Sequence, residues 1–283
     1  MSKTGSAAKV KLNSFDDLFG TEHPQTGTEQ VQEIALSELQ EFKGHPFKVL
    51  DDEKMQETVE SIREHGVLMP GIARPMKDGG YEIIAGHRRR HACELVGLVT
   101  MPMFIRDYTD DEATIIMVDS NIQREDILPS EKAKAYFMKY EAVKHQGKKG
   151  KGNSLDEVGE TAGESAKTVQ RYIYLAHLSD ALLDMVDKKK IGIVQGVELS
   201  FLTEQQQEWV QVVLEETGVI ISTVQASKLK EYGKSDELTL PMVRLILTEQ
   251  KPRERKVTIK ADKISRYFPD CLLYTSDAAD DKA

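Results

Sequence analysis

Three consecutive arginines stand where a strand pattern gives way to a helical one. They are Arg88, Arg89 and Arg90, in the segment AGHRRRHACELVG (85–97). Cations in a first helical turn oppose the helix dipole, at a cost of roughly 0.3–1 kcal/mol each. A bound anion would offset that cost, because free backbone N–H groups and guanidinium groups both suit phosphate. The segment predicts a phosphate site at which at most two arginines face the ligand; the alternative is a basic surface turn paired with carboxylates.

A second polar cluster, SNIQRED (120–126), ends a predicted helix and precedes Pro129. Its amide, guanidinium and carboxylate groups can bind a metal ion or a phosphate. The same groups can equally cap a junction between two helices. Alone, this cluster leaves the alternatives open.

The segment ETAGESAKTVQRYIYL (160–175) has the spacing of a helix-turn-helix. Gly163 falls at the tight turn, and Ser165 can cap the second helix. The exposed side of the second helix is expected to carry Lys167, Thr168, Gln170 and Arg171. Together with Ser165, these side chains can reach the phosphates and base edges of DNA. The alternative is an ordinary helical hairpin, and the lysines at 148, 149 and 151 favour DNA binding.

Isolated reactive side chains are interpreted structurally. Cys93 lies inside an amphipathic helix and is expected to be a buried thiol. His87 and His91 are four positions apart, as in a metal pair, but the sequence offers no evident third ligand.

The composition restricts the class of protein. The 283 residues, 40% of them hydrophobic and 30% charged, suffice for about two domains. Two cysteines exclude a disulfide framework and a CxxC zinc site, and favour a cytoplasmic location. No stretch reaches the roughly 18 apolar residues of a membrane span, and the N-terminus lacks the apolar core of a secretory signal. The net charge of −9 requires that any contact with DNA come from a local patch.

A small sheet and a long helical region must position the three clusters. Strand patterns occur at 34–39, 72–76, 81–85 and 101–105, and the DGG turn at 78–80 predicts a hairpin. Helical spacing occurs at 52–65, with Gly66 as its C-cap, and at 87–96. Further helices are predicted at 110–123, 129–145, 155–178, 179–190, 203–216, 222–232 and 239–250. The predicted class is α+β: a small mixed-sheet N-terminal domain followed by a mostly α-helical helix-turn-helix domain.

The order of motifs resembles that of the ParB/RepB/Spo-type partition proteins. The motifs are GVLMP (66–70), GHRRRHACELVG (86–97), SNIQREDILPSEKAKAY (120–136) and the helix-turn-helix, and the resemblance covers roughly residues 33–250. It implies a ParB/sulfiredoxin-like domain that binds CTP, and a helix-turn-helix domain that binds a palindromic centromere-like site in double-stranded DNA. It further implies a homodimer that closes as a sliding clamp in plasmid or chromosome partition, associated with the nucleoid or a plasmid. A ParA-type ATPase would be its partner.

The resemblance also assigns the nucleotide site. The motif at 66–70 would lie beside the cytosine base, through Gly66, Val67, Met69 and Pro70. The phosphates would be held by Gly86, His87, Arg88 and Arg89, with Asn121, Gln123 and Arg124 completing the site. Asn121 would also be a ligand of Mg²⁺.

Two positions depart from the pattern of the chromosomal family. His87 replaces the usual Glu of GERR, and Ser120 replaces the usual Glu of ENxQR. The first carboxylate is associated with hydrolysis and the second with Mg²⁺. We therefore expect CTP binding with slow or no hydrolysis, in a chain most similar to ParB-like proteins of plasmids and integrative elements.

Other functions remain as alternatives. One is a transcription or nucleoid-occlusion regulator on the same scaffold. From another class come a sulfiredoxin-like enzyme, for which Cys93 would be the nucleophile, and a nuclease, for which the motifs offer only Glu125 and Asp126.

The domain boundaries follow from these patterns. We expect a disordered arm (1–32), the ParB/sulfiredoxin-like nucleotide-binding domain (33–110), connecting helices (111–146), a linker (147–153), the helix-turn-helix domain (154–235) and a C-terminal segment (236–270). The final CLLYTSDAADD (271–281) resembles translated sequencing-adapter DNA, a transposase mosaic end. We interpret residues 271–283 as read-through, with the natural chain cut near Asp270 and its dimerisation segment missing.

Overall fold

The computed structural model describes residues 30–124, 126–146, 154–235 and 237–249. The predicted linker, most of the predicted N-terminal arm, the C-terminal segment from residue 250 and the read-through segment lie outside these residues. The chain divides into two compact units, Met1–Phe201 and Leu202–Ala283. No helix among the described residues is long and apolar enough to cross a membrane.

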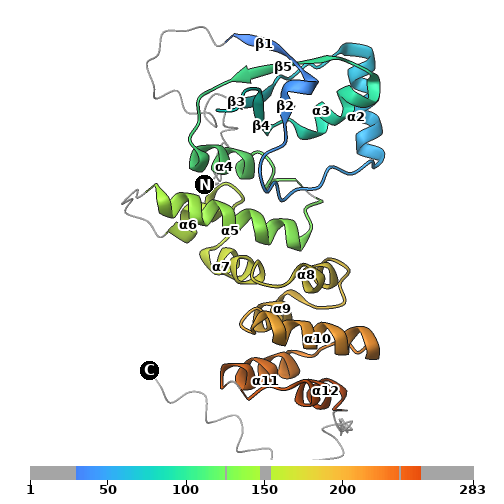
Figure 1. Ribbon diagram of the computed structural model, residues 1–283, viewed down its shortest axis with the longest axis vertical. Helices are drawn as coiled ribbons and strands as arrows, with labels where there is room; N and C mark the ends of the chain where they lie inside the picture. Colours follow the sequence, from blue (N-terminus) through green and yellow to red (C-terminus); the bar gives the residue numbers. More distant parts are fainter. Residues whose placement is uncertain (1–29, 125, 147–153, 236, 250–283) are drawn as a thin grey trace, which may run out of the picture. The chain divides into compact units, whose positions relative to one another are not determined.

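The first unit begins with a mixed five-stranded sheet (Figure 1). Its strands are β1 (Val31–Ala35), β2 (Leu39–Gln40), β3 (Gly71–Pro75), β4 (Tyr81–Ala85) and β5 (Thr100–Ile105), in the order β1-β5-β3-β4-β2. β1 and β5, and β3 and β4, pair antiparallel, whereas β3 with β5 and β2 with β4 are parallel. The predicted hairpin at the DGG turn is the β3–β4 pair, and the mixed sheet confirms the predicted fold class.

The prediction of a single strand at 34–39 is wrong. A 3-10 turn at Leu36–Glu38 divides the segment into β1 and β2, which lie at opposite edges of the sheet. Because only the three residues of that turn separate the two edge strands, the sheet must curl. The Leu36 N–H donates to Val99 O (2.9 Å), and both Leu36 and Leu39 are buried, so the turn keeps the apolar side chains in the core.

Helices cover both faces of the sheet, since successive strand residues point to opposite sides. Ile83 packs with helices α2 (Glu53–His65) and α3 (His87–Val96). The next residue, Ile84, packs with α4 (Asp110–Asp119) and α5 (Pro129–His145). The pocket described below forms where the start of α3 and the end of α4 meet at the C-terminal end of β4.

Local signals determine where these helices start and stop. Asp52 caps α2 by accepting from Met55 N (2.8 Å), and Gly66 ends it at φ +70°, as predicted. Thr109 and Glu112 form a capping box at the start of α4. Residues close to each helix end therefore determine where that helix begins or stops.

The remaining described residues are helical. The first unit continues with α6 (Ser154–Glu160), α7 (Ala166–Leu175), α8 (Asp180–Asp187) and α9 (Ile193–Leu199), and the second contains α10 (Glu204–Thr217), α11 (Thr223–Lys234) and α12 (Leu240–Thr248). Helix α9 was not predicted, because it is short and contains Gly196, a poor helix former. A Cβ on Gly196 would lie 2.6 Å from Leu175 Cδ1, so glycine is needed for close packing onto α7.

Candidate functional site

Two motifs that are far apart in the sequence meet at one pocket. The pocket has a volume of about 180 Å³. The β4–α3 junction contributes Ala85, Gly86, His87, Arg88 and Arg89, the end of α4 and the turn after it contribute Ser120, Asn121 and Arg124, and the segment before α2 contributes His45 and Val49. The structure therefore brings together most of the residues assigned to phosphate binding. Gly66, Val67, Met69, Pro70 and Gln123 do not line it.

Gly86 shapes the floor of the pocket. Its φ of +115° is a conformation that favours glycine, and a Cβ there would lie 3.2 Å from Gly71 Cα. No described side chain caps α3 at this residue. The N–H groups of the first helical turn are thus available to an anion, as the sequence predicts.

Two of the three arginines face the pocket. Arg88 Nη2 donates to Asp52 Oδ1 (2.9 Å), and this guanidinium lowers the pKa of the Asp52 carboxyl. Arg89 donates to Pro70 O (2.9 Å) and to Met69 O, and burial lowers its pKa. Arg90 instead pairs with Glu94 (3.1 Å), so the predicted limit of two arginines is met.

The 66–70 motif forms a rim beside Arg89. Both carbonyl acceptors of Arg89 belong to this motif, whereas the side chains of Leu68 and Met69 are exposed. The motif contacts Arg89 but does not line the cavity. Its contact with the cytosine base stays a prediction.

Two histidines form a wall of the pocket, and the sequence predicted only one of them. The rings of His45 and His87 stack with centroids 3.9 Å apart and an angle of 37° between their planes. Burial, together with His45 and Arg90, lowers the pKa of His87 to about 3, and burial also lowers the pKa of His45. Both rings are neutral near pH 7. His45 carries no local signal, because its place depends on how the connection from β2 to α2 folds back.

The end of α4 offers few ligands for a metal. Asn121 Nδ2 and Ser120 Oγ both donate to Met117 O (2.9 and 3.0 Å). The described residues contain no group of three or more His, Cys, Asp or Glu that could hold a metal. The amide oxygen of Asn121 is a hard donor, but Mg²⁺ favours carboxylates and phosphates. This donor set fits a phosphate better than an ion held by the protein alone.

Gln123 connects the pocket motif to the helix-turn-helix. Its Nε2 donates to Thr161 O (2.9 Å), in the turn after α6. Buried Lys139 adds a second connection by donating to Asp119 Oδ1 (2.5 Å) and Thr161 Oγ1 (3.2 Å). The segment that contributes Ser120 and Asn121 is therefore bonded directly to the turn between α6 and α7.

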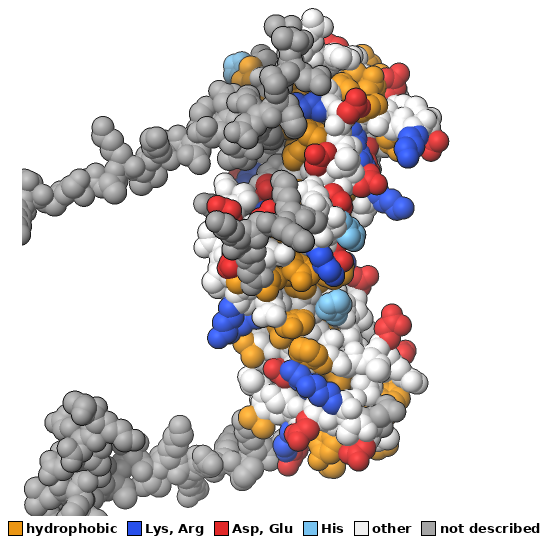
Figure 2. All heavy atoms as spheres, turned by 90° about the vertical axis from the view of Figure 1, so that its left-hand side faces the viewer, with side chains coloured by type: hydrophobic (Ala, Val, Ile, Leu, Met, Phe, Trp, Pro, Cys, Tyr) orange, Lys and Arg blue, Asp and Glu red, His pale blue; other side chains and the backbone are white. Residues whose placement is uncertain are grey.

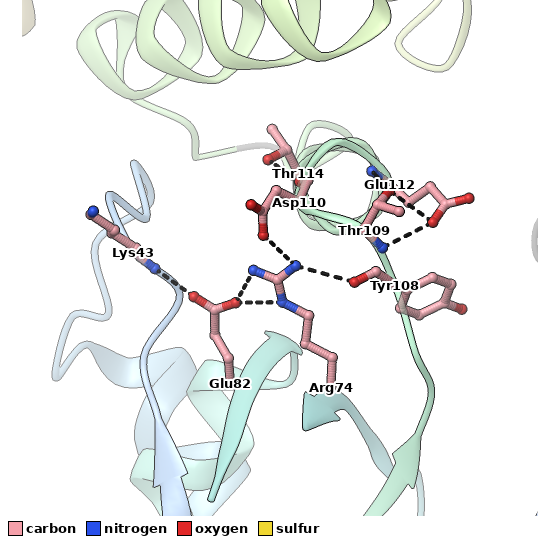
Figure 3. Close-up of polar contacts among 8 residues, drawn as sticks. All are labelled: Lys43, Arg74, Glu82, Tyr108, Thr109, Asp110, Glu112 and Thr114. Carbon is pink, nitrogen blue, oxygen red and sulfur yellow. Dashed lines mark hydrogen bonds and ion pairs between the residues drawn. The ribbon is translucent and has the colours of Figure 1, made fainter. Parts of the chain in front are cut away.

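Arg74 fixes the other end of α4 (Figure 3). It lies between Glu82 on β4 (Nε to Oε2, 2.7 Å) and Asp110 at the start of α4 (Nη1 to Oδ1, 2.7 Å). Nη1 also donates to Tyr108 O (3.2 Å), and the second oxygen of Glu82 accepts from Lys43 N (3.1 Å). The guanidinium thus joins the sheet to the helix whose far end lines the pocket.

The helix-turn-helix has the geometry expected from its sequence. Gly163 adopts φ +67° between α6 and α7, and Ser165 Oγ accepts from Thr168 N (3.3 Å). The side chains of Lys167, Gln170 and Arg171 are exposed, as is Ser165, whereas Thr168 is half-buried and Val169 and Ile173 are buried. On the face drawn in Figure 2, cationic and acidic side chains are interspersed.

The other reactive residues have structural roles. Cys93 is fully buried, and burial raises the pKa of its thiol, as expected for a core cysteine rather than a nucleophile. His91 Nε2 pairs with Asp51 Oδ1 (2.7 Å), whereas His87 stacks on His45, so the two do not share a metal. Asp126 pairs with Lys54, and Glu125 lies outside the described residues.

Comparison with known proteins identifies the family. Residues 20–122 match the family model of the ParB N-terminal domain. A relative from Deinococcus radiodurans, "Probable chromosome 1-partitioning protein ParB", is 32% identical over 209 residues, which cover 74% of this chain and 69% of the relative. The chain belongs to the ParB family. The resemblance noted from the motifs is thereby confirmed.

A further relative and a solved structure are also similar to this chain. A "Nucleoid occlusion protein" of Halalkalibacterium halodurans is 30% identical over 182 residues, 64% of this chain and 61% of the relative. The C-terminally truncated ParB of Caulobacter crescentus, solved with the centromeric parS site, is 21% identical, with a TM-score of 0.40 over 71% of this chain and 98% of that one.

Proposed function

We propose that the pocket at the start of α3 binds CTP. The observation that carries this proposal is the convergence of two family motifs, 86–89 and 120–124, on one cavity. The cavity has the parts that a polyphosphate needs: an uncapped helix N-terminus, a glycine that admits close approach, and two arginines. The rim at 66–70 would adjoin the cytosine base.

We further propose that the chain is a site-specific DNA-binding partition protein. The exposed Lys167, Gln170 and Arg171 would meet a palindromic centromere-like site, with Ser165 and Thr168 near the phosphates. Recognition of a palindrome requires a homodimer, whose two-fold symmetry matches that of the DNA. A ParA-type ATPase would be its partner in the cytoplasm, on the nucleoid or a plasmid.

Hydrolysis of CTP would be slow or absent. Neither His87 nor Ser120 offers the carboxylate found at these positions in chromosomal family members. Any Mg²⁺ would be held chiefly by the phosphates, with the amide oxygen of Asn121 as a protein ligand. When bound, the ion would neutralise phosphate charge.

A second candidate function is nucleoid occlusion. The relatives include a protein of that name, and both functions would use the same nucleotide pocket and DNA-binding helix. The distribution of binding sites distinguishes them: a partition site lies near an origin or on an element, whereas occlusion requires sites across a chromosome. Genome-wide mapping of the bound DNA would decide between the two.

Substitution of Arg89 tests the nucleotide assignment. Loss of a charge-assisted contact costs about 1.5–3 kcal/mol, so Arg89→Ala should weaken CTP binding roughly 10- to 150-fold in calorimetry. Arg63→Ala, at an exposed position on α2, is the matched control and should leave the affinity unchanged. Arg89→Lys retains the charge but loses the planar guanidinium, and should fall between the two. Equal CTP affinity in wild type and Arg89→Ala refutes the assignment.

A further inference from the structure

The stacked pair of His45 and His87 has buried polar atoms without partners. Among the described residues, Nε2 of each ring is buried and makes no hydrogen bond. A buried polar atom without a partner costs free energy, and such atoms are rare unless a ligand or water supplies the partner. Both rings line the pocket beside Arg88 and Arg89, so a ligand in the pocket can supply it.

The charged groups around the pair favour an anion. His45 is influenced by Glu41, Glu131 and Arg124, and His87 by Arg90 and by His45 itself. Arg88 and Arg89 approach from α3, and Arg124 from the turn after α4. Among the described residues, no carboxylate lines the pocket. A phosphate group would therefore meet positive charge and unpartnered ring nitrogens together.

We propose that His45 and His87 form a proton-dependent receptor for a phosphate group of the nucleotide. Their Nε2–H groups would donate to phosphate oxygens, and the pair would take up at most one proton as the phosphate binds. Two protonated rings at a 3.9 Å separation would repel each other, which limits the uptake to one. This inference rests on the proposed nucleotide function and adds a pH dependence to it.

The direction of the pH dependence follows from the charges. In the free protein, burial lowers the pKa of both rings, so both are neutral near pH 7. Phosphate charge raises the pKa of the ring that it contacts. A group whose pKa is higher in the complex favours binding at low pH, and that advantage is lost as the pH rises through the pKa of the complex. If that pKa reaches about 7, CTP affinity should rise about tenfold between pH 8 and pH 6.

The test is calorimetric titration of the full chain with CTP at pH 6, 7 and 8. Two buffers with different ionisation enthalpies give the number of protons taken up per CTP. The wild type is compared with His45→Asn, His87→Asn and the double variant, because asparagine stays polar but does not titrate here. The terminal phosphate of CTP also titrates in this range, but its contribution is common to all the proteins and cancels in the comparison. His65→Asn, at an exposed position at the end of α2, is the matched control.

For each CTP bound, the wild type and the His65→Asn control should take up more protons than the double variant, with a difference of at most one proton. Between pH 8 and pH 6 their CTP affinity should also gain about a factor of ten over that of the double variant. The same pH dependence and proton count in wild type and double variant overturns the inference, whereas absence of CTP binding by the wild type at every pH overturns the proposed function as well. Histidine NMR titration of the wild type needs no variant to fold: a histidine pKa should rise when CTP is added, and unchanged values contradict the proposal.

Discussion

Substitution of Gly86 by alanine tests the geometry of the pocket floor. A residue with a Cβ at φ +115° is strained by about 1–3 kcal/mol. The added Cβ would also lie 3.2 Å from Gly71 Cα and 3.5 Å from Arg89 Nη2. Backbone cannot move aside as a flexible side chain can, so we expect a loss of about 2–4 kcal/mol in the free energy of unfolding. CTP affinity should fall at least about tenfold, because a strained backbone at Gly86 shifts the N–H groups of the first turn of α3 that would meet the phosphates.

Gly97, at the other end of α3, provides the matched control. Its φ is +85°, but no described atom lies within 4 Å of the Cβ position. Gly97→Ala should therefore cost only the strain of the left-handed conformation, about 1–2 kcal/mol, and leave CTP binding unchanged. Alanine restricts the unfolded chain equally in both variants, so that effect cancels. Urea denaturation and calorimetry measure the two quantities; equal losses of stability, or full CTP affinity in Gly86→Ala, refute the reasoning.

Three further predictions concern other parts of the molecule. Lys139→Met removes the buried cation that pairs with Asp119, and should lower the free energy of unfolding in urea by about 3 kcal/mol. A loss below about 1 kcal/mol contradicts this prediction. Gln170→Ala should relax base preference, and Arg171→Ala should weaken binding to all DNA sequences alike. If both variants give the same DNA footprint as the wild type, the DNA-binding surface lies elsewhere. His87→Glu combined with Ser120→Glu should raise CTP hydrolysis, measured as phosphate release; brisk hydrolysis by the unmodified chain shows that the catalytic groups were misassigned.

Features with short-range causes could be predicted from the sequence. The stop at Gly66 and the hairpin at the DGG turn were predicted, because each depends on a few adjacent residues. The helix-turn-helix was predictable for the same reason, since Gly163 and Ser165 determine its turn and cap. Phosphate binding stays a prediction, made because arginines at a helix N-terminus oppose the helix dipole; the structure confirms that these arginines begin a helix.

Features that depend on long-range packing could not be predicted. The division of 34–39 into two edge strands requires knowledge of how the sheet curls. His45 reaches the pocket only because the connection from β2 to α2 folds back against α3. The sequence did not decide between the alternatives for the motif at 120–126. In the structure its residues have two roles: Asn121 lines the pocket, whereas Gln123 donates a hydrogen bond to the turn of the helix-turn-helix.

Nucleotide selectivity is the most direct test of the central claim. The full chain should be titrated by calorimetry with CTP and, separately, with UTP, ATP and GTP under identical conditions. The pocket predicts binding of one CTP per chain, with clearly weaker binding of the other three, because all four share the phosphates and differ at the base beside the 66–70 rim. Failure of CTP to bind, or equal affinity for all four nucleotides, contradicts the account.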